Sequence, residues 1–274
     1  MSNIIERVDY FSCGYCKNKL GVMFKNSKNE KKLSGIINFP AGVFLIKHRE
    51  IGYILYDTGY GIDILKNNFK YFLYRAPNPI ILKKEDLISE QLLKRGINQN
   101  EIRYVILSHL HPDHIGDVKK FQNAKIIITE DCYENYKNSR LKDLIFKEFL
   151  PKYFEERVEI IKEYKKLKDF PVKVKDLFGD GSLYLASING HSRGQGCLFV
   201  KEKNLFIAAD VCWGVDLMKY TERMRTLPKL VQDNFKDYER GIDILENIQK
   251  EKIDVIVSHD PEERIKKILY EENN

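Results

Sequence analysis

The 274-residue sequence predicts an α/β fold, and three observations support this prediction. Short apolar runs rich in Val, Ile and Leu fall into two groups, one in each half of the chain. Amphipathic or strongly charged segments, typical of helices, lie between and after these groups. Several of the apolar runs end in a His or Asp residue, as a strand does when it leads into a loop that carries function.

The first group of strands is expected in the N-terminal part of the chain. Its members are residues 5–12, 20–25, 36–48 and 51–57. A helical stretch rich in aromatic residues, 62–96, comes next and is broken at Pro77-Asn78-Pro79. The apolar run Tyr104-Val105-Ile106-Leu107 then predicts a buried strand. A short helix at 115–121 and a strand at 125–129 follow it.

The second group of strands follows a charged segment, residues 130–166, that we expect to be largely helical. The members of this group are residues 172–174, 182–189, 196–201 and 204–209. Two amphipathic helices, 237–251 and 261–271, flank a last strand at 253–258. The sequence contains no internal repeat or low-complexity tract, so we expect residues 1–274 to form a single domain.

The most informative feature is the segment Ser108-His109-Leu110-His111-Pro112-Asp113-His114, which contains four residues of types that bind metal ions. The chain has only six His residues, and three of them lie here. The segment leaves the carboxyl end of a predicted strand, where a rigid scaffold meets solvent. His109 and His111 alternate and can point toward one ion, while Asp113 and His114 can turn toward another. Imidazole and carboxylate ligands suit metals such as zinc.

Three further residues of these types each follow a predicted strand. They are His191, Asp210 and His259. One such residue means little, because Asp and Asn commonly end strands. Three of them, in a chain that also contains the H-x-H-x-D-H segment, predict that all seven converge on one site. His48 has only charged neighbours, so we expect it at the surface without a role.

Taken together, these segments resemble the metallo-β-lactamase superfamily over most of the chain. The matching motifs, in the order of the family, are Asp57-Thr58-Gly59, the H-x-H-x-D-H segment, Gly190-His191-Ser192, Ala209-Asp210 and Ser258-His259-Asp260. The resemblance implies a four-layer αββα sandwich with a two-metal site along one edge. The first ion would be held by His109, His111 and His191. The second would be held by Asp113, His114 and His259, with Asp210 as the bridge.

These assignments make chemical sense. Two cations about 3.5–4 Å apart can share a hydroxide, lower its pKa and polarise a carbonyl or phosphoryl oxygen. Asp210 would offset the repulsion between the cations, and Asp113 would also orient the attacking water. We therefore expect Asp113 and Asp210 to be catalytic. Asp57 either holds a ligand His in the required tautomer or closes a turn at a strand end, and the two roles are compatible.

The bridging residue narrows the activity. In the family that the chain resembles, hydrolases of lactones, thioesters and phosphodiesters carry Asp here, whereas zinc β-lactamases commonly carry Cys. Flavo-diiron oxidoreductases usually carry Glu where this chain has His111. We therefore expect a dinuclear zinc hydrolase of a small ester or lactone, with Mn²⁺ or Fe²⁺ as other candidate metals. The alternatives are a phosphodiesterase or thioesterase of the same superfamily and, from another class, a metal-binding module without turnover.

Among the branches of the family, the chain most resembles the N-acyl homoserine lactonases. Those enzymes place a Tyr, which hydrogen-bonds the substrate carbonyl, three residues after the bridging Asp. Here that position is Trp213, which donates only through its indole N–H. We expect Trp213 and Tyr60 to contact the substrate. Other candidates for an apolar channel, or else for ordinary core packing, are Phe69, Tyr71, Phe72, Met218 and Tyr220.

The composition predicts a cytoplasmic enzyme that acts on a small molecule. Hydrophobic residues make up 43% of the chain, enough for a core, and no segment is long and apolar enough to span a membrane. The N-terminus lacks the apolar region of a signal peptide. The five Cys residues suggest no disulfide framework, and we expect Cys13 and Cys16 to be incidental thiols near an early strand. A homo-oligomer is compatible with the sequence.

The net charge of +6 raises the question of nucleic-acid binding. Lys residues are interspersed with Glu along the chain, which is typical of solvated helix faces. The most basic stretch, residues 25–32, also contains Asn and Ser and is expected to be an exposed loop. We therefore do not expect a nucleic-acid partner.

Overall fold

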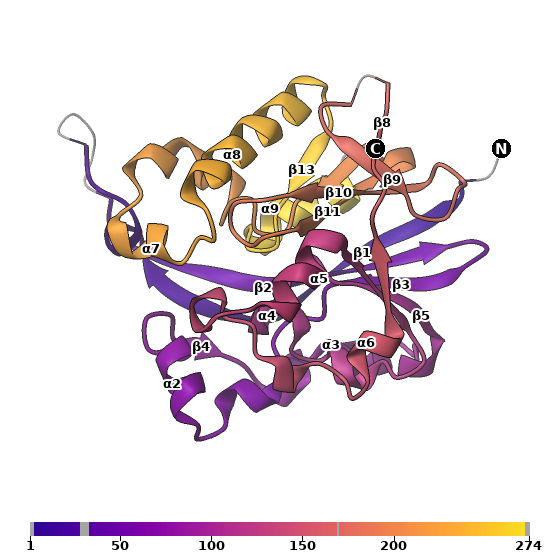
Figure 1. The fold of residues 1–274 in the computed structure, drawn as a ribbon, viewed down its shortest axis with the longest axis horizontal. Coiled ribbons are helices and arrows are strands. Elements are labelled where there is room, and N and C mark those ends of the chain that lie inside the picture. Colours follow the sequence, from indigo (N-terminus) through magenta and orange to yellow (C-terminus); the bar gives the residue numbers. More distant parts are fainter. Residues whose placement is uncertain (1–2, 28–32, 169, 272–274) are drawn as a thin grey trace.

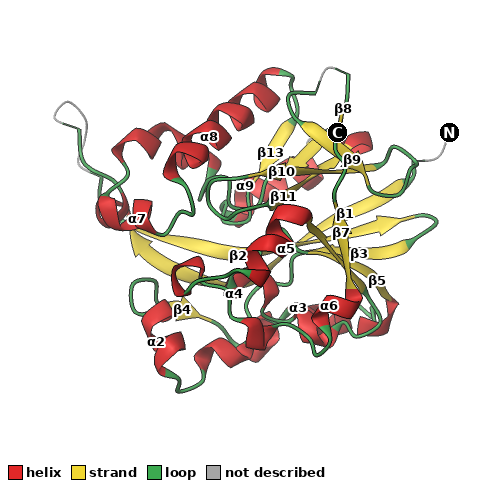
Figure 2. Ribbon diagram, in the orientation of Figure 1, coloured by secondary structure: helices red, strands yellow, loops and turns green. Residues whose placement is uncertain are grey.

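The computed structural model describes residues 3–27, 33–168 and 170–271 (Figure 1). Two β-sheets pack face to face, and helices cover the outer face of each sheet (Figure 2). The layers therefore follow the order α, β, β, α, which confirms the predicted four-layer fold.

The first sheet contains seven strands in the described part of the chain, in the order β4-β1-β2-β3-β5-β6-β7. Their bounds are β1 (Ile5–Lys19), β2 (Ile36–His48), β3 (Gly52–Tyr56), β4 (Ile80–Ile81), β5 (Ile102–Ile106), β6 (Lys125–Thr129) and β7 (Val158–Ile161). Strands β1, β2 and β3 pair antiparallel, whereas β3, β5, β6 and β7 pair in parallel. Because β3 and β5 are parallel, the Asp57 loop and the His-rich segment leave the sheet at the same edge.

The second sheet has six strands among the described residues, in the order β13-β12-β11-β10-β9-β8. Their bounds are β8 (Lys165–Lys166), β9 (Lys173–Asp176), β10 (Leu183–Ile188), β11 (Gln195–Val200), β12 (Leu205–Ile207) and β13 (Asp254–Ile256). Strand β11 is antiparallel to both β10 and β12, and β12 is parallel to β13. Strands β10, β12 and β13 therefore run in one direction, and the residues that follow them meet at one edge.

The helices are short except for α8. Their bounds are α1 (Leu20–Met23), α2 (Phe69–Arg75), α3 (Ile88–Lys94), α4 (Pro112–Ile115), α5 (Glu130–Lys137), α6 (Phe154–Arg157), α7 (Thr226–Leu230), α8 (Phe235–Lys250) and α9 (Glu262–Lys266). Helix α8 begins after Asn234, whose side chain accepts hydrogen bonds from the next backbone amides, as an N-cap residue does. The helix lies on the outer face of the second sheet (Figure 1). Its buried residues Leu245 and Ile248 belong to the same core cluster as Phe206 of β12.

Strand β2 explains why the core has several layers. Side chains alternate between the two faces of a strand. Val43 and Leu45 pack with the helices of the first layer, while Phe44 and Ile46 pack between the two sheets, and all four are fully buried. A strand that is apolar on both faces must be covered on both, so this sequence can only lie in an inner layer.

Three predicted elements differ in the structure. Residues 20–25 do not form a strand, because β1 continues to Lys19 along β2 and helix α1 then ends the strand. The region 62–96 is not one helical stretch: α2 and α3 are separated by the segment with Pro77 and Pro79, which leads into the short strand β4. The region 130–166 is not largely helical, since the β-branched residues of β7 extend the first sheet beside β6.

The prediction that His48 lies at the surface was wrong. His48 is 1% exposed, and its Nε2 lies 2.8 Å from Asp180 Oδ2. Its Nδ1 accepts hydrogen bonds from the backbone amides of Glu50 and Ile51, both at 3.3 Å. The charged neighbours in the sequence gave no indication of this, because His48 ends strand β2 and its partner comes from a distant loop.

Two further predictions concern membrane-spanning segments and the basic loop at residues 25–32. No helix within residues 3–27, 33–168 and 170–271 is long and apolar enough to cross a membrane. Residues 28–32 of the predicted basic loop lie outside the described residues.

Candidate metal centre

The ends of β5, β10, β12 and β13 bring seven His and Asp side chains to one edge of the sandwich. Their candidate ligand atoms form two groups, and within each group these atoms lie within 4.8 Å of one another. The first group contains His109, His111 and His191, and the second contains Asp113, His114, Asp210 and His259. All seven residues are buried. These are the seven residues that the sequence nominated as ligands.

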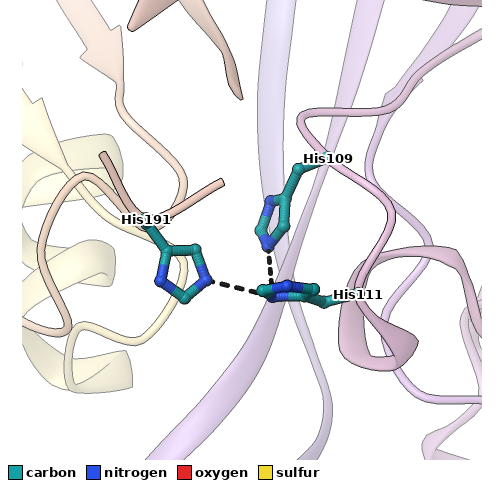
Figure 3. Close-up of side chains that lie close together, drawn as sticks. All are labelled: His109, His111 and His191. Carbon is teal, nitrogen blue, oxygen red and sulfur yellow. Dashed lines mark hydrogen bonds between the residues drawn. The ribbon is translucent and has the colours of Figure 1, made fainter. Parts of the chain in front are cut away.

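The first cluster consists of three imidazole rings turned toward one another (Figure 3). The Nδ1 atom of His111 lies 3.0 Å from Nε2 of His109 and 3.0 Å from Nε2 of His191. Ligands placed 2.0–2.1 Å from a tetrahedral zinc ion lie about 3.3 Å apart. The spacing of the three nitrogens is therefore close to what one shared ion requires.

The second cluster combines two carboxylates with two imidazoles. Nε2 of His259 lies 2.8 Å from Asp210 Oδ2 and 3.5 Å from Asp113 Oδ2. Nε2 of His114 lies 3.4 Å from Asp210 Oδ1. Four candidate ligand atoms thus converge here, of a kind that suits a divalent cation.

Asp210 lies between the two clusters. Its Oδ2 is 3.5 Å from Nε2 of His191, in the first cluster, and 2.8 Å from Nε2 of His259, in the second. The preceding residue, Ala209, has a φ of 46°, a conformation that side chains seldom adopt. This turn directs the Asp210 carboxylate back toward the edge of the sheet, so that one side chain contacts both groups.

Two buried atoms at this point have no hydrogen-bond partner, namely His114 Nε2 and Asp210 Oδ1. Leaving a buried polar atom unpaired costs about 1–3 kcal/mol. Both atoms face the interior of the second cluster, where a cation would coordinate them. The donor set and these two unpaired atoms therefore fit a metal ion.

The protonation of the first cluster and of Asp210 also fits a metal. Burial, together with the neighbouring His191, lowers the pKa of His111 to about 3. Burial likewise lowers the pKa of His109 well below its usual value. Burial tends to raise the pKa of Asp210, but His259 and His114 outweigh it and hold that pKa well below its ordinary value. Neutral imidazoles and an ionised carboxylate are the forms that bind metal ions. In the second cluster burial tends to lower the pKa of His259 and of His114, but Asp210 outweighs it and raises the pKa of His259 to about 9 and that of His114 well above its usual value. An ion that enters the second cluster would therefore displace protons from these two rings.

Four of the clustered His residues have a partner for the ring nitrogen that points away from the centre. The pairs are His109 Nδ1 with Ser108 Oγ at 3.0 Å, His114 Nδ1 with Asp57 Oδ2 at 2.7 Å, His191 Nδ1 with Gln232 Oε1 at 2.8 Å and His259 Nδ1 with the carbonyl of Pro40 at 2.7 Å. Such partners fix the tautomer and the orientation of a metal-binding ring. Nε2 of each of these rings is thereby directed toward the centre.

The loop after β3 holds the His-rich segment in place. Asp57 Oδ1 accepts a hydrogen bond from the amide of Ser108 at 2.7 Å, while its Oδ2 contacts His114. The amide and the hydroxyl of Thr58 both donate to the carbonyl of His114. A Cβ atom on Gly59 would lie 2.2 Å from Cβ of Cys13, so only glycine fits there. Asp57 therefore both closes the strand end and contacts a clustered His.

A cavity of about 290 Å³ opens above the clusters. Five of the clustered residues line it: His111, Asp113, His191, Asp210 and His259. Its other lining residues include Cys16, Met23, Phe39, Tyr60, Tyr74 and Trp213, together with the exposed residues Val22, Leu73, Leu227 and Val231. The floor is thus polar and the walls are largely apolar. Trp213 and Tyr60, which the sequence predicts to contact the substrate, are among the residues that line this cavity.

The other channel candidates do not line this cavity. Phe69 and Phe72 are exposed on the outer side of α2, and the ring of Tyr71 stacks on Phe146. Met218 belongs to the core beneath the second sheet, and Tyr220 packs against it. Of the two alternatives left open for these residues, core packing therefore applies to Tyr71, Met218 and Tyr220, while Phe69 and Phe72 lie on the exposed face of α2.

Sequence reasoning missed Tyr74 and Gln232. The Tyr74 hydroxyl lies 3.1 Å from Asp113 Oδ1, and Gln232 contacts His191 as described above. Neither residue follows a strand, and no motif marks either of them.

The five cysteines are free, and Cys13 and Cys212 are buried in the core. Cys16 lies on β1 and lines the cavity.

A sequence model of the metallo-beta-lactamase superfamily matches residues 39–259. The chain belongs to the metallo-β-lactamase superfamily. Both the family and the αββα fold agree with what the sequence predicted. Membership makes the chain a metal-dependent hydrolase of this superfamily, and residues 39–259 include all seven clustered side chains.

Individual relatives within the superfamily are distant. The chain is 25% identical to the N-acyl homoserine lactonase AttM of Rhizobium radiobacter over 242 residues, which cover 81% of this chain and 82% of AttM. A B. thuringiensis AiiA variant with N-decanoyl-L-homoserine bound at its active site superposes with a TM-score of 0.72 at 22% identity, covering 96% of both chains. AidC, a dizinc quorum-quenching lactonase, superposes with a TM-score of 0.64 at 19% identity, covering 93% of this chain and 87% of AidC.

Proposed function

We propose that this member of the metallo-β-lactamase superfamily is a dinuclear zinc lactonase that opens a small lactone or ester with an apolar substituent. The observation that carries this proposal is the position of Asp210, whose carboxylate contacts the His191 side of one cluster and the His114 and His259 side of the other. The lactonase relatives, including a dizinc neighbour, support the choice of zinc and of a lactone.

Each part of the site has a defined task in this proposal. His109, His111 and His191 would hold one ion, and Asp113, His114 and His259 would hold the other, with Asp210 between them. When bound, the two ions would activate a water molecule and polarise the substrate carbonyl.

The protein side chains would do the rest. Asp113 has one carboxylate oxygen near the second cluster and the other toward the cavity. It is therefore placed to take a proton from the attacking water and return it to the leaving oxygen. Phe39, Met23 and Trp213 form apolar walls that would exclude bulk water and receive the apolar part of the substrate.

The cavity favours a lactone over a phosphodiester. Among the described residues that line it there is no Lys or Arg, so the negative charge of a phosphodiester would meet no cationic side chain. A neutral lactone needs no such partner. A thioesterase remains the closer alternative, because a thioester is also neutral.

The experiment is a metal analysis followed by a substrate panel. We expect protein purified without chelator to contain about two zinc ions per chain, the number on which the two-cluster assignment depends. We expect turnover of acyl lactones to exceed that of thioesters and of bis-aryl phosphodiesters. A saturated content of one ion would exclude the dinuclear centre. Two ions together with preferential phosphodiester turnover would replace the lactonase by a phosphodiesterase.

A further inference from the structure

Tyr74 reaches the metal centre from an unexpected direction. It lies on α2, 39 residues before Asp113, on a helix that otherwise presents Phe69, Phe72 and Leu73 to the surface. Its ring turns inward and lines the cavity, and its hydroxyl lies 3.1 Å from Asp113 Oδ1. An ionised carboxylate can only accept hydrogen bonds, so the phenol donates to Asp113.

The Tyr74 side chain is held from two sides. The side chain of Tyr60, which is 1% exposed, lies beside the Tyr74 phenol in the lining of the cavity, and the two hydroxyl groups interact. The backbone of Tyr60 is fixed in turn, since its amide donates to the carbonyl of Cys13. On the other side, the Tyr74 ring packs edge-on against Phe146, with 5.6 Å between ring centroids. The phenol is therefore a donor in a constrained position.

The two oxygens of Asp113 consequently have different surroundings. Oδ2 lies 3.5 Å from His259 Nε2 and 3.8 Å from His114 Nε2, so it faces the second cluster. Oδ1 faces Tyr74 and the cavity. The torsion that turns a carboxylate about its last bond is broad and roughly two-fold, so nothing in the Asp113 side chain itself keeps the two oxygens apart in this way. The phenol supplies that constraint.

We propose that Tyr74 is a positioning residue, which holds Asp113 with Oδ2 toward the second cluster and Oδ1 toward the substrate. This inference rests on the proposed lactonase function. In ring opening, the carbonyl carbon gains the oxygen of water, the C–O bond of the ring breaks, and its electron pair stays on the leaving oxygen. Asp113 takes a proton from the water and delivers it to that oxygen, which regenerates the carboxylate.

The test is Tyr74→Phe, with Tyr71→Phe as a matched control. Tyr71 lies on the same helix, and its hydroxyl donates to Glu148 Oε1, also at 3.1 Å but away from the metal centre. Two substrates are compared: an alkyl lactone, whose leaving oxygen must be protonated, and an aryl acetate, whose leaving group needs no acid. A proton donor matters most for the poorer leaving group.

For Tyr74→Phe we expect kcat on the lactone to fall about 10-fold to 100-fold, with KM nearly unchanged, whereas kcat on the aryl acetate falls only a few-fold. Calorimetric titration of metal-free protein with Zn²⁺ gives a second readout. Both variants should bind two ions, but one of the two affinities should fall about tenfold in Tyr74→Phe, as for other partners of ligand side chains. Tyr71→Phe should behave as the wild type in both measurements.

Equal losses on both substrates, or wild-type kinetics with wild-type zinc affinity, would overturn the positioning role. If the wild type hydrolyses no lactone, the proposed function fails, and the zinc titration alone then decides the role of Tyr74. Should Tyr74→Phe not fold, as judged by circular dichroism, Tyr60→Phe removes the supporting hydroxyl instead. Tyr60→Phe should also lower kcat on the lactone more than kcat on the aryl acetate, but by a smaller factor. If kcat fell equally on both substrates, or not at all, the proposal would be contradicted.

Discussion

Apart from the contacts of Asp113 and Asp210, two buried His rings in the described part of the chain each pair with an Asp at nearly the same distance, and the difference between these two His–Asp pairs is instructive. Asp57 is fully buried, whereas the Asp180 side chain is 29% exposed. His48 Nε2 lies 2.8 Å from Asp180, and His114 Nδ1 lies 2.7 Å from Asp57. The other nitrogen of His48 accepts two backbone hydrogen bonds, so the ring is fully paired. The other nitrogen of His114 has no hydrogen-bond partner and faces Asp210.

This contrast separates a structural His from a candidate ligand. A carboxylate beside a ring occurs at both places, so it does not by itself indicate a metal site. What distinguishes His114 is a buried nitrogen with no partner among the described residues, since such an atom is costly unless something else binds it. The His48 pair joins a strand end to a loop, whereas the His114 pair leaves one atom available for a cation.

The largest effect is expected from Asp210, the group that the free nitrogen of His114 faces. Asp210→Asn should keep the fold but weaken the binding of one or both metal ions, because a neutral amide offsets cationic charge poorly. Turnover should fall by about 100-fold or more, in line with losses from disrupting the surroundings of a metal. Elemental analysis and kinetics on the same preparation provide the measurement. Wild-type metal content together with wild-type activity would rule out a bridging role.

The two His–Asp pairs can be compared directly by Asp57→Asn and Asp180→Asn. Each change replaces the carboxylate by an isosteric amide next to a buried ring. We expect Asp57→Asn to lower the affinity for one zinc ion about 10-fold to 100-fold. Asp180→Asn should leave both zinc affinities unchanged and affect only the thermal midpoint of unfolding. Equal zinc affinities in the two variants would show that the Asp57 pair, like the Asp180 pair, is only structural.

The sequence predicted the seven clustered residues because each follows a strand, and strand ends are readable from apolar runs. The four-layer fold was implied by the resemblance to the metallo-β-lactamase superfamily, which rests on the motifs at these strand ends. The residues that hold the clustered side chains in place were less predictable. Gln232 lies in the segment between α7 and α8, and Tyr74 lies on a helix of only seven residues. Their roles depend on which side chain happens to face the cavity after folding, which local periodicity does not determine.

His48 illustrates the same limit from the opposite direction. Its sequence neighbours are charged, and local patterning therefore places it at the surface. Its burial arises because residues 180–182 fold over the end of β2, with Ser182 Oγ 3.3 Å and Asp180 2.8 Å from its ring. A contact between residues 132 positions apart cannot be inferred from one sequence without knowledge of the topology.

A smaller effect is expected at Gln232, which contacts a clustered ring through a neutral group. The side-chain oxygen Oε1 of Gln232 accepts a hydrogen bond from His191 Nδ1, and its side-chain amide Nε2 donates a hydrogen bond to the carbonyl of Pro228. Gln232→Leu removes the acceptor at similar size, so His191 should lose its orientation, and affinity for one zinc ion should fall about tenfold. Gln232→Glu keeps an acceptor and should restore most of the affinity. Calorimetric titration of the three proteins decides this, and equal losses in both variants would mean that Gln232 acts by packing alone.

The smallest effect on the metals is expected at Trp213, whose ring meets His191 edge-on at 6.2 Å between centroids and lines the cavity. Trp213→Phe should leave both zinc affinities and most of kcat intact but change KM, since a wall residue contributes binding that is uniform between ground and transition state. Trp213→Tyr adds a phenol, which should raise lactone turnover if it reaches the developing oxyanion, an interaction worth about 3 kcal/mol when well placed. Steady-state kinetics on acyl lactones tests both. A large fall in kcat for Trp213→Phe, with KM unchanged, would instead place the indole N–H in the transition state, because only an interaction absent from the ground state acts on kcat alone.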